Sequence, residues 1–314
     1  MRWGAIFARI SSETLIDMTS RMAVAVFLAV FGSGIACSKL GIGTPTEPTP
    51  SPTPSSGPIF YTAIGASDGI GFGSSNVCVP LAPSCPDGKG YVPILDRQLQ
   101  TTGRAFDQRN LSLPGAVLSK NIEDLAASVG TPIESLVGNF IDRQAPFVPT
   151  STTHLTIFAG GNDANVIGRA VLAGRGGNDP NAYIDGQVRQ WGTDLEGMID
   201  KIRSRAPNAR IVALNLPNLA GAPYLASRPT SEKSIMQRIA VGLSDRVNAL
   251  TAKNVLVVDL MCDARLYQAQ NFASDGFHPG DAGYQIFADL TYPVLLNGTA
   301  ASPNTNCSQR RLFP

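Results

Sequence analysis

Residues 59–69 read IFYTAIGASDG, an apolar run that stops at a turn of small and polar residues. The run is typical of a buried strand, and the turn is typical of a strand-to-helix junction. A serine on such a turn is exposed, and backbone N–H groups at the start of the next helix can stabilise an oxyanion. Ser67 is therefore a candidate nucleophile, although a serine here can equally be a helix N-cap.

Apolar segments of two kinds alternate along the rest of the chain. Short runs typical of buried strands occupy residues 154–159, 209–214 and 255–260. Apolar residues at helical spacing predict helices over residues 91–100, 114–129, 183–203, 235–250 and 281–295. Such alternation predicts a parallel sheet with helices on both faces, and ligands of such sheets bind where the strands end.

Two further turns carry polar residues suited to nucleophilic catalysis by a serine. Asn162, in the GGND stretch 160–163, offers a side-chain amide N–H to an oxyanion. His278 follows Asp275 by three residues, so the carboxylate can reach Nδ1 and leave Nε2 free to accept a serine proton. The alternatives are ordinary turns in both places. The other histidine, His154, opens an apolar run and is expected to have a structural role.

Four motifs together resemble those of the SGNH/GDSL hydrolase family. They are GASD at 65–68, NLSLPG at 110–115, GGND at 160–163 and DGFHP at 275–279. The resemblance covers about residues 59–297, which we expect to form the hydrolase domain. It implies a three-layer α/β/α sandwich with a mostly parallel, flavodoxin-like sheet of about five strands. The family motif usually has an aspartate before the serine, whereas Ala66 precedes Ser67 here and Asp68 follows it.

The resemblance also implies a serine esterase or lipase that needs no metal or organic cofactor. Ser67 would attack the ester carbonyl, His278 would take the serine proton, and Asp275 would orient His278. The backbone N–H groups of Ser67 and Gly115 and the side chain of Asn162 would form the oxyanion hole. The expected substrate is a small-molecule or lipid ester.

Two other interpretations remain at this point. The GxSxG pattern at 65–69 also fits an α/β-hydrolase, but in that fold the nucleophile follows several strands. A non-catalytic surface lipoprotein that binds acyl or glycan ligands is the second alternative. The acyl length, the alcohol, and the choice between lipid and polysaccharide ester stay open. The Gly-rich segment 164–182 is expected to line or cover the substrate site.

The N-terminal residues 1–37 resemble a bacterial lipoprotein signal peptide. Arg21 precedes the apolar run MAVAVFLAVF at 22–31, and small residues lead to Cys37. Cys37 would be lipid-modified and would hold the chain at a membrane of the bacterial cell envelope. The alternative is ordinary secretion with a free Cys37. Residues 38–58 are rich in Pro, Thr and Ser and would form an extended tether. Translation would start at Met1, Met18 or Met22.

The remaining cysteines and the overall charge complete the predictions. An exported chain with an even number of cysteines suggests disulfides among Cys78, Cys85, Cys262 and Cys307, for which the sequence permits three pairings. A bond from Cys262 to Cys307 would pin the tail 298–314. Charged residues make up 16% of the chain and the formal net charge is +1, which gives no support for nucleic-acid binding. We expect a monomer.

Overall fold

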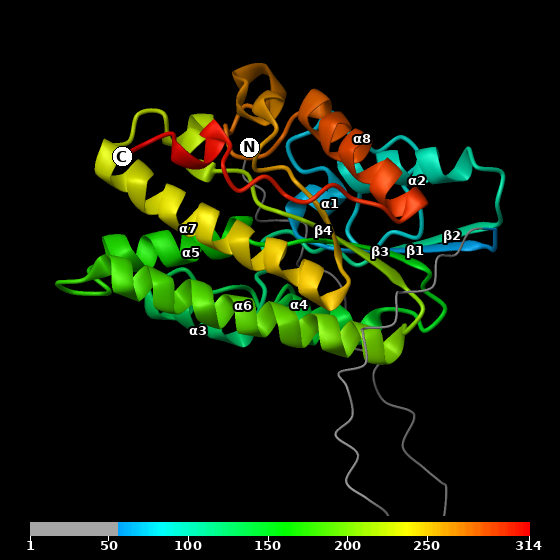
Figure 1. The fold of residues 1–314 in the computed structure, drawn as a ribbon, viewed down its shortest axis with the longest axis horizontal. Coiled ribbons are helices and arrows are strands. Elements are labelled where there is room, and N and C mark those ends of the chain that lie inside the picture. The colour runs from blue at the N-terminus through cyan, green and yellow to red at the C-terminus, as the bar shows by residue number, and fades with distance from the viewer. Residues whose placement is uncertain (1–55) are drawn as a thin grey trace, which may run out of the picture. The chain divides into compact units, whose positions relative to one another are not determined.

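A five-stranded parallel sheet forms the centre of the computed structural model, which describes residues 56–314 (Figure 1). The signal segment with Cys37 and most of the tether lie outside the described residues. The strands lie in the order β2-β1-β3-β4-β5, which is the flavodoxin-like order, and every neighbouring pair is parallel. The strands are β1 (Ile59–Ile64), β2 (Phe106–Asn110), β3 (His154–Phe158), β4 (Arg210–Leu214) and β5 (Leu256–Val258).

Burial explains why four of the strands could be predicted from the sequence and β2 could not. All residues of β3 and β4 are buried, as expected for strands covered on both faces. The edge strand β2 reads FDQRN and alternates between half-buried and exposed residues. One apolar residue in five gives no strand pattern, so β2 takes its conformation from pairing with β1.

Helices cover both faces of the sheet and complete three layers (Figure 1). On one face, α2 packs against α8, and α8 also contacts β3, β4 and β5. On the other face, α5 packs against α3, α6 and α7. The predicted three-layer α/β/α sandwich is therefore confirmed. The helices are α1 (Ser67–Ile70), α2 (Tyr91–Gln100), α3 (Lys120–Ser128), α4 (Phe140–Arg143), α5 (Gly161–Leu172), α6 (Pro180–Arg205), α7 (Thr230–Ala249) and α8 (Asp281–Asn297).

Two predicted segments differ from the structure. The helix expected from Pro114 begins only at Lys120, because Gly115 has a φ of +83° and the chain up to residue 119 forms an irregular loop. Residues 164–172, expected to be part of a Gly-rich loop, continue α5, whose Ala164, Val166 and Ile167 are buried in the core. Gly, Asn and Asp at the start of this helix hide its apolar face from a sequence pattern.

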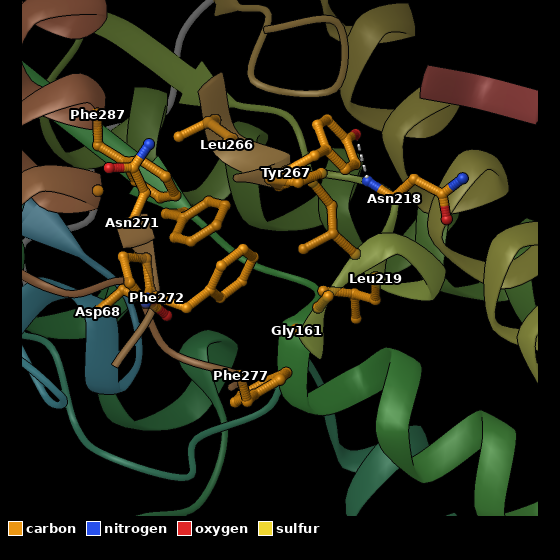
Figure 2. Close-up of a pocket in the computed structure, with 16 residues that line it drawn as sticks. Asp68, Gly161, Asn218, Leu219, Leu266, Tyr267, Asn271, Phe272, Phe277 and Phe287 are labelled. Atoms are coloured by element: carbon orange, nitrogen blue, oxygen red, sulfur yellow. Dashed lines mark hydrogen bonds between the residues drawn. The ribbon is translucent and has the colours of Figure 1, made fainter. Parts of the chain in front are cut away.

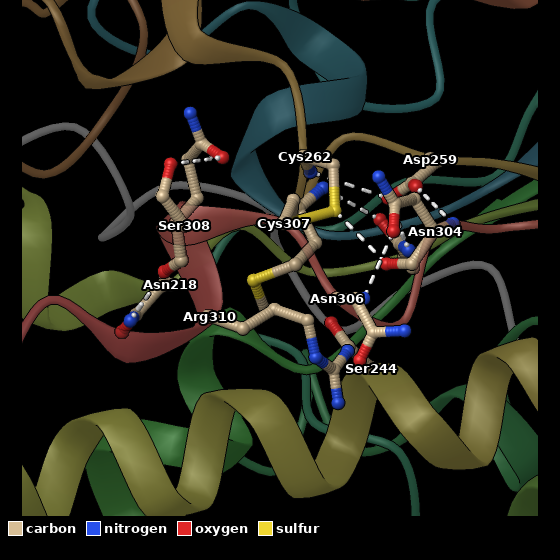
Figure 3. Close-up of a disulfide and its surroundings, with 12 residues drawn as sticks. Asn218, Ser244, Asp259, Cys262, Asn304, Asn306, Cys307, Ser308 and Arg310 are labelled. Atoms are coloured by element: carbon tan, nitrogen blue, oxygen red, sulfur yellow. Dashed lines mark hydrogen bonds between the residues drawn. A yellow bond between two sulfur atoms is a disulfide. The ribbon is translucent and has the colours of Figure 1, made fainter.

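The structure contains two disulfides, Cys78–Cys85 and Cys262–Cys307. The second joins the end of the sheet region to the C-terminal tail, as Figure 3 shows. The tail is also held by the ion pair between Arg310 and Asp245 at 2.8 Å. Within residues 56–314, no helix is both long and apolar enough to span a membrane.

Candidate active site

The structure brings the predicted nucleophile, base and acid into one chain of hydrogen bonds. Ser67 begins α1 directly after β1, and His278 lies in the loop before α8. The Oγ atom of Ser67 is 2.8 Å from Nε2 of His278, across 211 residues of sequence. On the other side of the ring, Nδ1 is 2.6 Å from Oδ2 of Asp275. Ser67 is 5% exposed, so the hydroxyl is largely sheltered from water.

Asp275 also holds the backbone of its own loop. Its Oδ1 accepts hydrogen bonds from the backbone N–H groups of Phe277 at 2.9 Å and His278 at 3.0 Å. Burial raises the pKa of Asp275, but the hydrogen bonds from His278 and Phe277 outweigh it, and the pKa lies below its ordinary value. An ionised carboxylate thus fixes both the imidazole and the peptide that carries it.

The turn that carries Ser67 is held by a residue that the sequence did not single out. The side chain of Gln144, which is fully buried, accepts from the backbone N–H of Gly65 at 3.0 Å and donates to its carbonyl oxygen at 2.9 Å. Gly69 is needed for a different reason, because a Cβ atom there would lie 2.0 Å from Oγ of Ser112. The second glycine of the GxSxG pattern is therefore a packing requirement of this turn.

Gly115 and Asn162 are the other two predicted oxyanion-hole residues; Gly115 lies in the loop before α3, and Asn162 lies in the first turn of α5. Nδ2 of Asn162 donates to the carbonyl oxygen of Ala116 at 2.9 Å, which leaves one amide N–H of Asn162 for a ligand. The positive φ of Gly115 is a backbone conformation that favours glycine. Among the hydrogen bonds of residues 56–314, none uses the backbone N–H of Ser67 or of Gly115.

Asp163 joins the first turn of α5 to the loop that carries Gly115. Its Oδ1 accepts from the backbone N–H of Leu118 at 2.8 Å and from Nε1 of Trp191 at 3.0 Å. Burial raises the pKa of Asp163 to about 6, against the lowering effect of these hydrogen bonds. The aspartate of GGND is therefore a structural residue, and it holds the Gly115 loop against the start of α5, where Asn162 lies.

Two cavities adjoin this site. The larger has an empty volume of about 600 Å³, partly open to solvent, and most of its wall is apolar, including Phe158, Leu216, Phe272 and Phe287 (Figure 2). The smaller, of about 270 Å³, is lined by Ala116 and Asn162 among others. No residue of 164–182 lines either cavity, so the expectation that this segment lines the site is wrong.

Asp68, which follows the predicted nucleophile Ser67, lies in the wall of both cavities. Burial raises the pKa of its carboxyl group, and the proximity of His278 partly offsets that rise. The carboxyl group in this position adds an acidic group to a wall that is mostly apolar but also includes Asn218, Tyr267 and Asn271.

His154 lies at the opposite end of the sheet from Ser67, at the start of β3. It is fully buried, its Nδ1 is 2.7 Å from Oγ1 of Thr153, and burial lowers its pKa to about 4. This agrees with the structural role expected for it. A search of residues 56–314 finds no cluster of His, Cys, Asp or Glu side chains that could hold a metal ion.

Comparisons with known proteins fit this geometry. The sequence model of the GDSL-like lipase/acylhydrolase family matches residues 65–286. A search of curated proteins finds no match. The structure is similar to the lipase Lip_vut3 from a goat rumen metagenome, with a TM-score of 0.50, 18% identity, and 74% of this chain and 95% of that chain covered. It is also similar to a protein of Parabacteroides merdae named as a GDSL-like lipase, with a TM-score of 0.51, 16% identity, and 80% and 100% coverage.

Proposed function

Because this chain belongs to the GDSL-like lipase/acylhydrolase family and is a carboxylic ester hydrolase, we propose that it works through an acyl-enzyme on Ser67. Oγ of Ser67 attacks the ester carbonyl carbon, and Nε2 of His278 takes the hydroxyl proton. The same proton then passes to the leaving alcohol as the tetrahedral intermediate collapses. A water molecule repeats the sequence on the acyl-enzyme, which releases the acid and restores Ser67.

The single observation that carries this proposal is the unbroken hydrogen-bond chain from Ser67 through His278 to Asp275, with spacings of 2.8 Å and 2.6 Å. A base within hydrogen-bond reach of the hydroxyl meets the first requirement of general base catalysis. The ionised Asp275 supports the role of His278 as the base. Its carboxylate favours the His278 tautomer with the proton on Nδ1 and stabilises the imidazolium that forms.

The oxyanion hole that we propose consists of the backbone N–H groups of Ser67 and Gly115 and the free amide N–H of Asn162. Two observations support it. Asn162 is held in place by its bond to Ala116, and Gly115 lies in the neighbouring loop that Asp163 fixes. Donors fixed before reaction cost no reorganisation, and losing one typically costs about 3 kcal/mol of transition-state stabilisation.

We propose an ester with an apolar acyl group as the substrate. The aromatic and aliphatic wall of the larger cavity supports this choice, because burying an acyl chain there removes apolar surface from water. The cavity begins at Asp68 and at Phe277, the immediate neighbours of Ser67 and His278. An acyl group attached to Ser67 would therefore lie close to the larger cavity.

Hydrolysis of p-nitrophenyl esters from acetate to palmitate tests this function. The purified chain should release p-nitrophenol, Ser67→Ala should not, and the exposed serine variant Ser128→Ala should match the wild type. Turnover that survives in Ser67→Ala would exclude the proposed nucleophile. Binding of esters with no turnover by the wild type would instead favour the non-catalytic alternative.

We also propose export to the bacterial cell envelope, with a lipid on Cys37 as the membrane anchor and residues 38–58 as the tether. Two disulfides support an oxidising compartment. In cells fed an alkyne-labelled fatty acid, the wild-type chain should carry the label and Cys37→Ser should not. Equal labelling of both would exclude this anchor. A monomer is expected in gel filtration of the chain without residues 1–37.

A further inference from the structure

The larger and the smaller cavity share part of their walls. Four residues line both of them, namely Asp68, Phe158, Gly161 and Phe277. The proposed oxyanion donor Asn162 also lines the smaller cavity, so this cavity is the space nearest to the reacting carbonyl. The larger cavity lies beyond the shared residues.

Of these four residues, Phe277 has the side chain best able to open or close the junction. Phe158 is 6% exposed and packs in the core edge-to-face on Phe287, with ring centroids 5.4 Å apart. Gly161 has no side chain, and Asp68 has a short one. Phe277 is large, half-buried and part of a loop. Its ring reaches across the junction, since a Cβ atom on Gly161 would lie 3.5 Å from Cζ of Phe277.

A hydrogen bond fixes the backbone of Phe277, whereas its ring is held only by packing against other side chains. Its N–H donates to Asp275, the carboxylate that also orients His278. The ring stands edge-to-face on His278 at 4.8 Å and on Tyr224 at 5.1 Å between centroids. Rotation of the ring would therefore break these two aromatic contacts but no hydrogen bond.

We propose that Phe277 determines acyl-chain specificity by separating the two cavities. With the ring as described, a short acyl group fits in the smaller cavity beside Asn162. A longer chain reaches the apolar larger cavity only when the ring is displaced. This inference rests on the proposed function of Ser67, and it adds to it the residue that selects the length of the acyl group.

The test compares kcat/KM for p-nitrophenyl octanoate and p-nitrophenyl acetate within each variant of the full chain. In Phe277→Ala the octanoate-to-acetate ratio should rise by about tenfold or more over the wild type, because the added methylenes gain a buried site. The rise should come mainly from a lower KM for octanoate. Phe277→Trp should lower the ratio.

Phe272→Ala is the matched control, since Phe272 lines the larger cavity but not the smaller one. Phe272→Ala removes the same kind of ring without opening the junction between the cavities, so the octanoate-to-acetate ratio should not rise. An unchanged ratio in Phe277→Ala, or an equal rise in Phe272→Ala, would overturn the inference while leaving Ser67 as the nucleophile. If Phe277→Ala does not fold, Phe277→Leu should give an intermediate rise, and no rise there would also overturn it.

Discussion

Gln144 hydrogen-bonds both backbone polar groups of Gly65, with N–O distances of 3.0 Å and 2.9 Å, although 79 residues separate them. Gly65 is the last residue before the turn that carries Ser67. The amide of Gln144 therefore fixes the start of that turn from outside its own loop. Because the site is buried, no water is at hand to replace either bond.

Replacing Gln144 with leucine should destabilise the fold and reduce activity. Two buried backbone groups lose their partner, so the free energy of unfolding should fall by roughly 2–4 kcal/mol. Urea denaturation measures this loss. Gln190→Leu is the control, since Gln190 is exposed on α6 and bonds only Asp194. Equal stability of the two variants would contradict a structural role for Gln144.

Asp275→Asn should lower kcat by about 10⁴-fold with little change in KM, because the amide no longer favours the tautomer with the proton on Nδ1. Initial rates with p-nitrophenyl acetate measure the effect. The variant keeps an oxygen that can accept from the N–H groups of Phe277 and His278. A wild-type kcat in Asp275→Asn would show that the carboxylate only shapes the loop.

The stability of the protein should depend on pH through Asp163. Its pKa is raised from 3.8 to about 6 by burial, so the neutral carboxyl is the form that the fold prefers. Its contribution is fully present below pH 4 and is lost as the pH rises through about 6, an effect of about 3 kcal/mol. Comparing urea unfolding at pH 4 and pH 7 for the wild type and Asp163→Asn isolates it. Asp163→Asn should lose less stability between pH 4 and pH 7 than the wild type. An equal loss in both proteins would contradict a raised pKa of Asp163.

The two disulfides should differ in their effect on stability. Cys262–Cys307 spans 45 residues and Cys78–Cys85 spans 7, so the longer loop removes more entropy from the unfolded chain. Replacing Cys262 and Cys307 together with serine should cost about 2–4 kcal/mol of unfolding free energy. The matching double variant at Cys78 and Cys85 should cost less, and the reverse order in urea denaturation would refute this account.

Local patterns in the sequence were enough to predict most of the sheet. The apolar runs of β1, β3 and β4 are buried along nearly their whole length, so composition and burial agree there. The edge strand β2 and the helix α5 could not be predicted. The polar sequence of β2 has no strand pattern, and the residues Gly-Asn-Asp at the start of α5 are not typical of a helix. The sequence permits three disulfide pairings, and the structure contains the one in which Cys262 joins Cys307 and pins the tail.

The site was predictable only where one short motif carries its chemistry. A short motif marks each of Ser67, Asn162, Asp275 and His278, and the structure brings them to one end of the sheet. Gln144 has no such motif, because its partner Gly65 is brought to it by the fold. The junction at Phe277 was likewise hidden, since it depends on cavities formed by several distant segments.

The most direct test of the central claim is the covalent labelling of Ser67 by diisopropyl fluorophosphate. The hydroxyl oxygen should displace fluoride and take the diisopropylphosphoryl group, and peptide mass spectrometry should locate it on Ser67. Ester turnover should fall in proportion to labelling, and Ser67→Ala should be neither labelled nor active. Full turnover by a chain that is completely labelled on Ser67 would contradict the proposed acyl-enzyme.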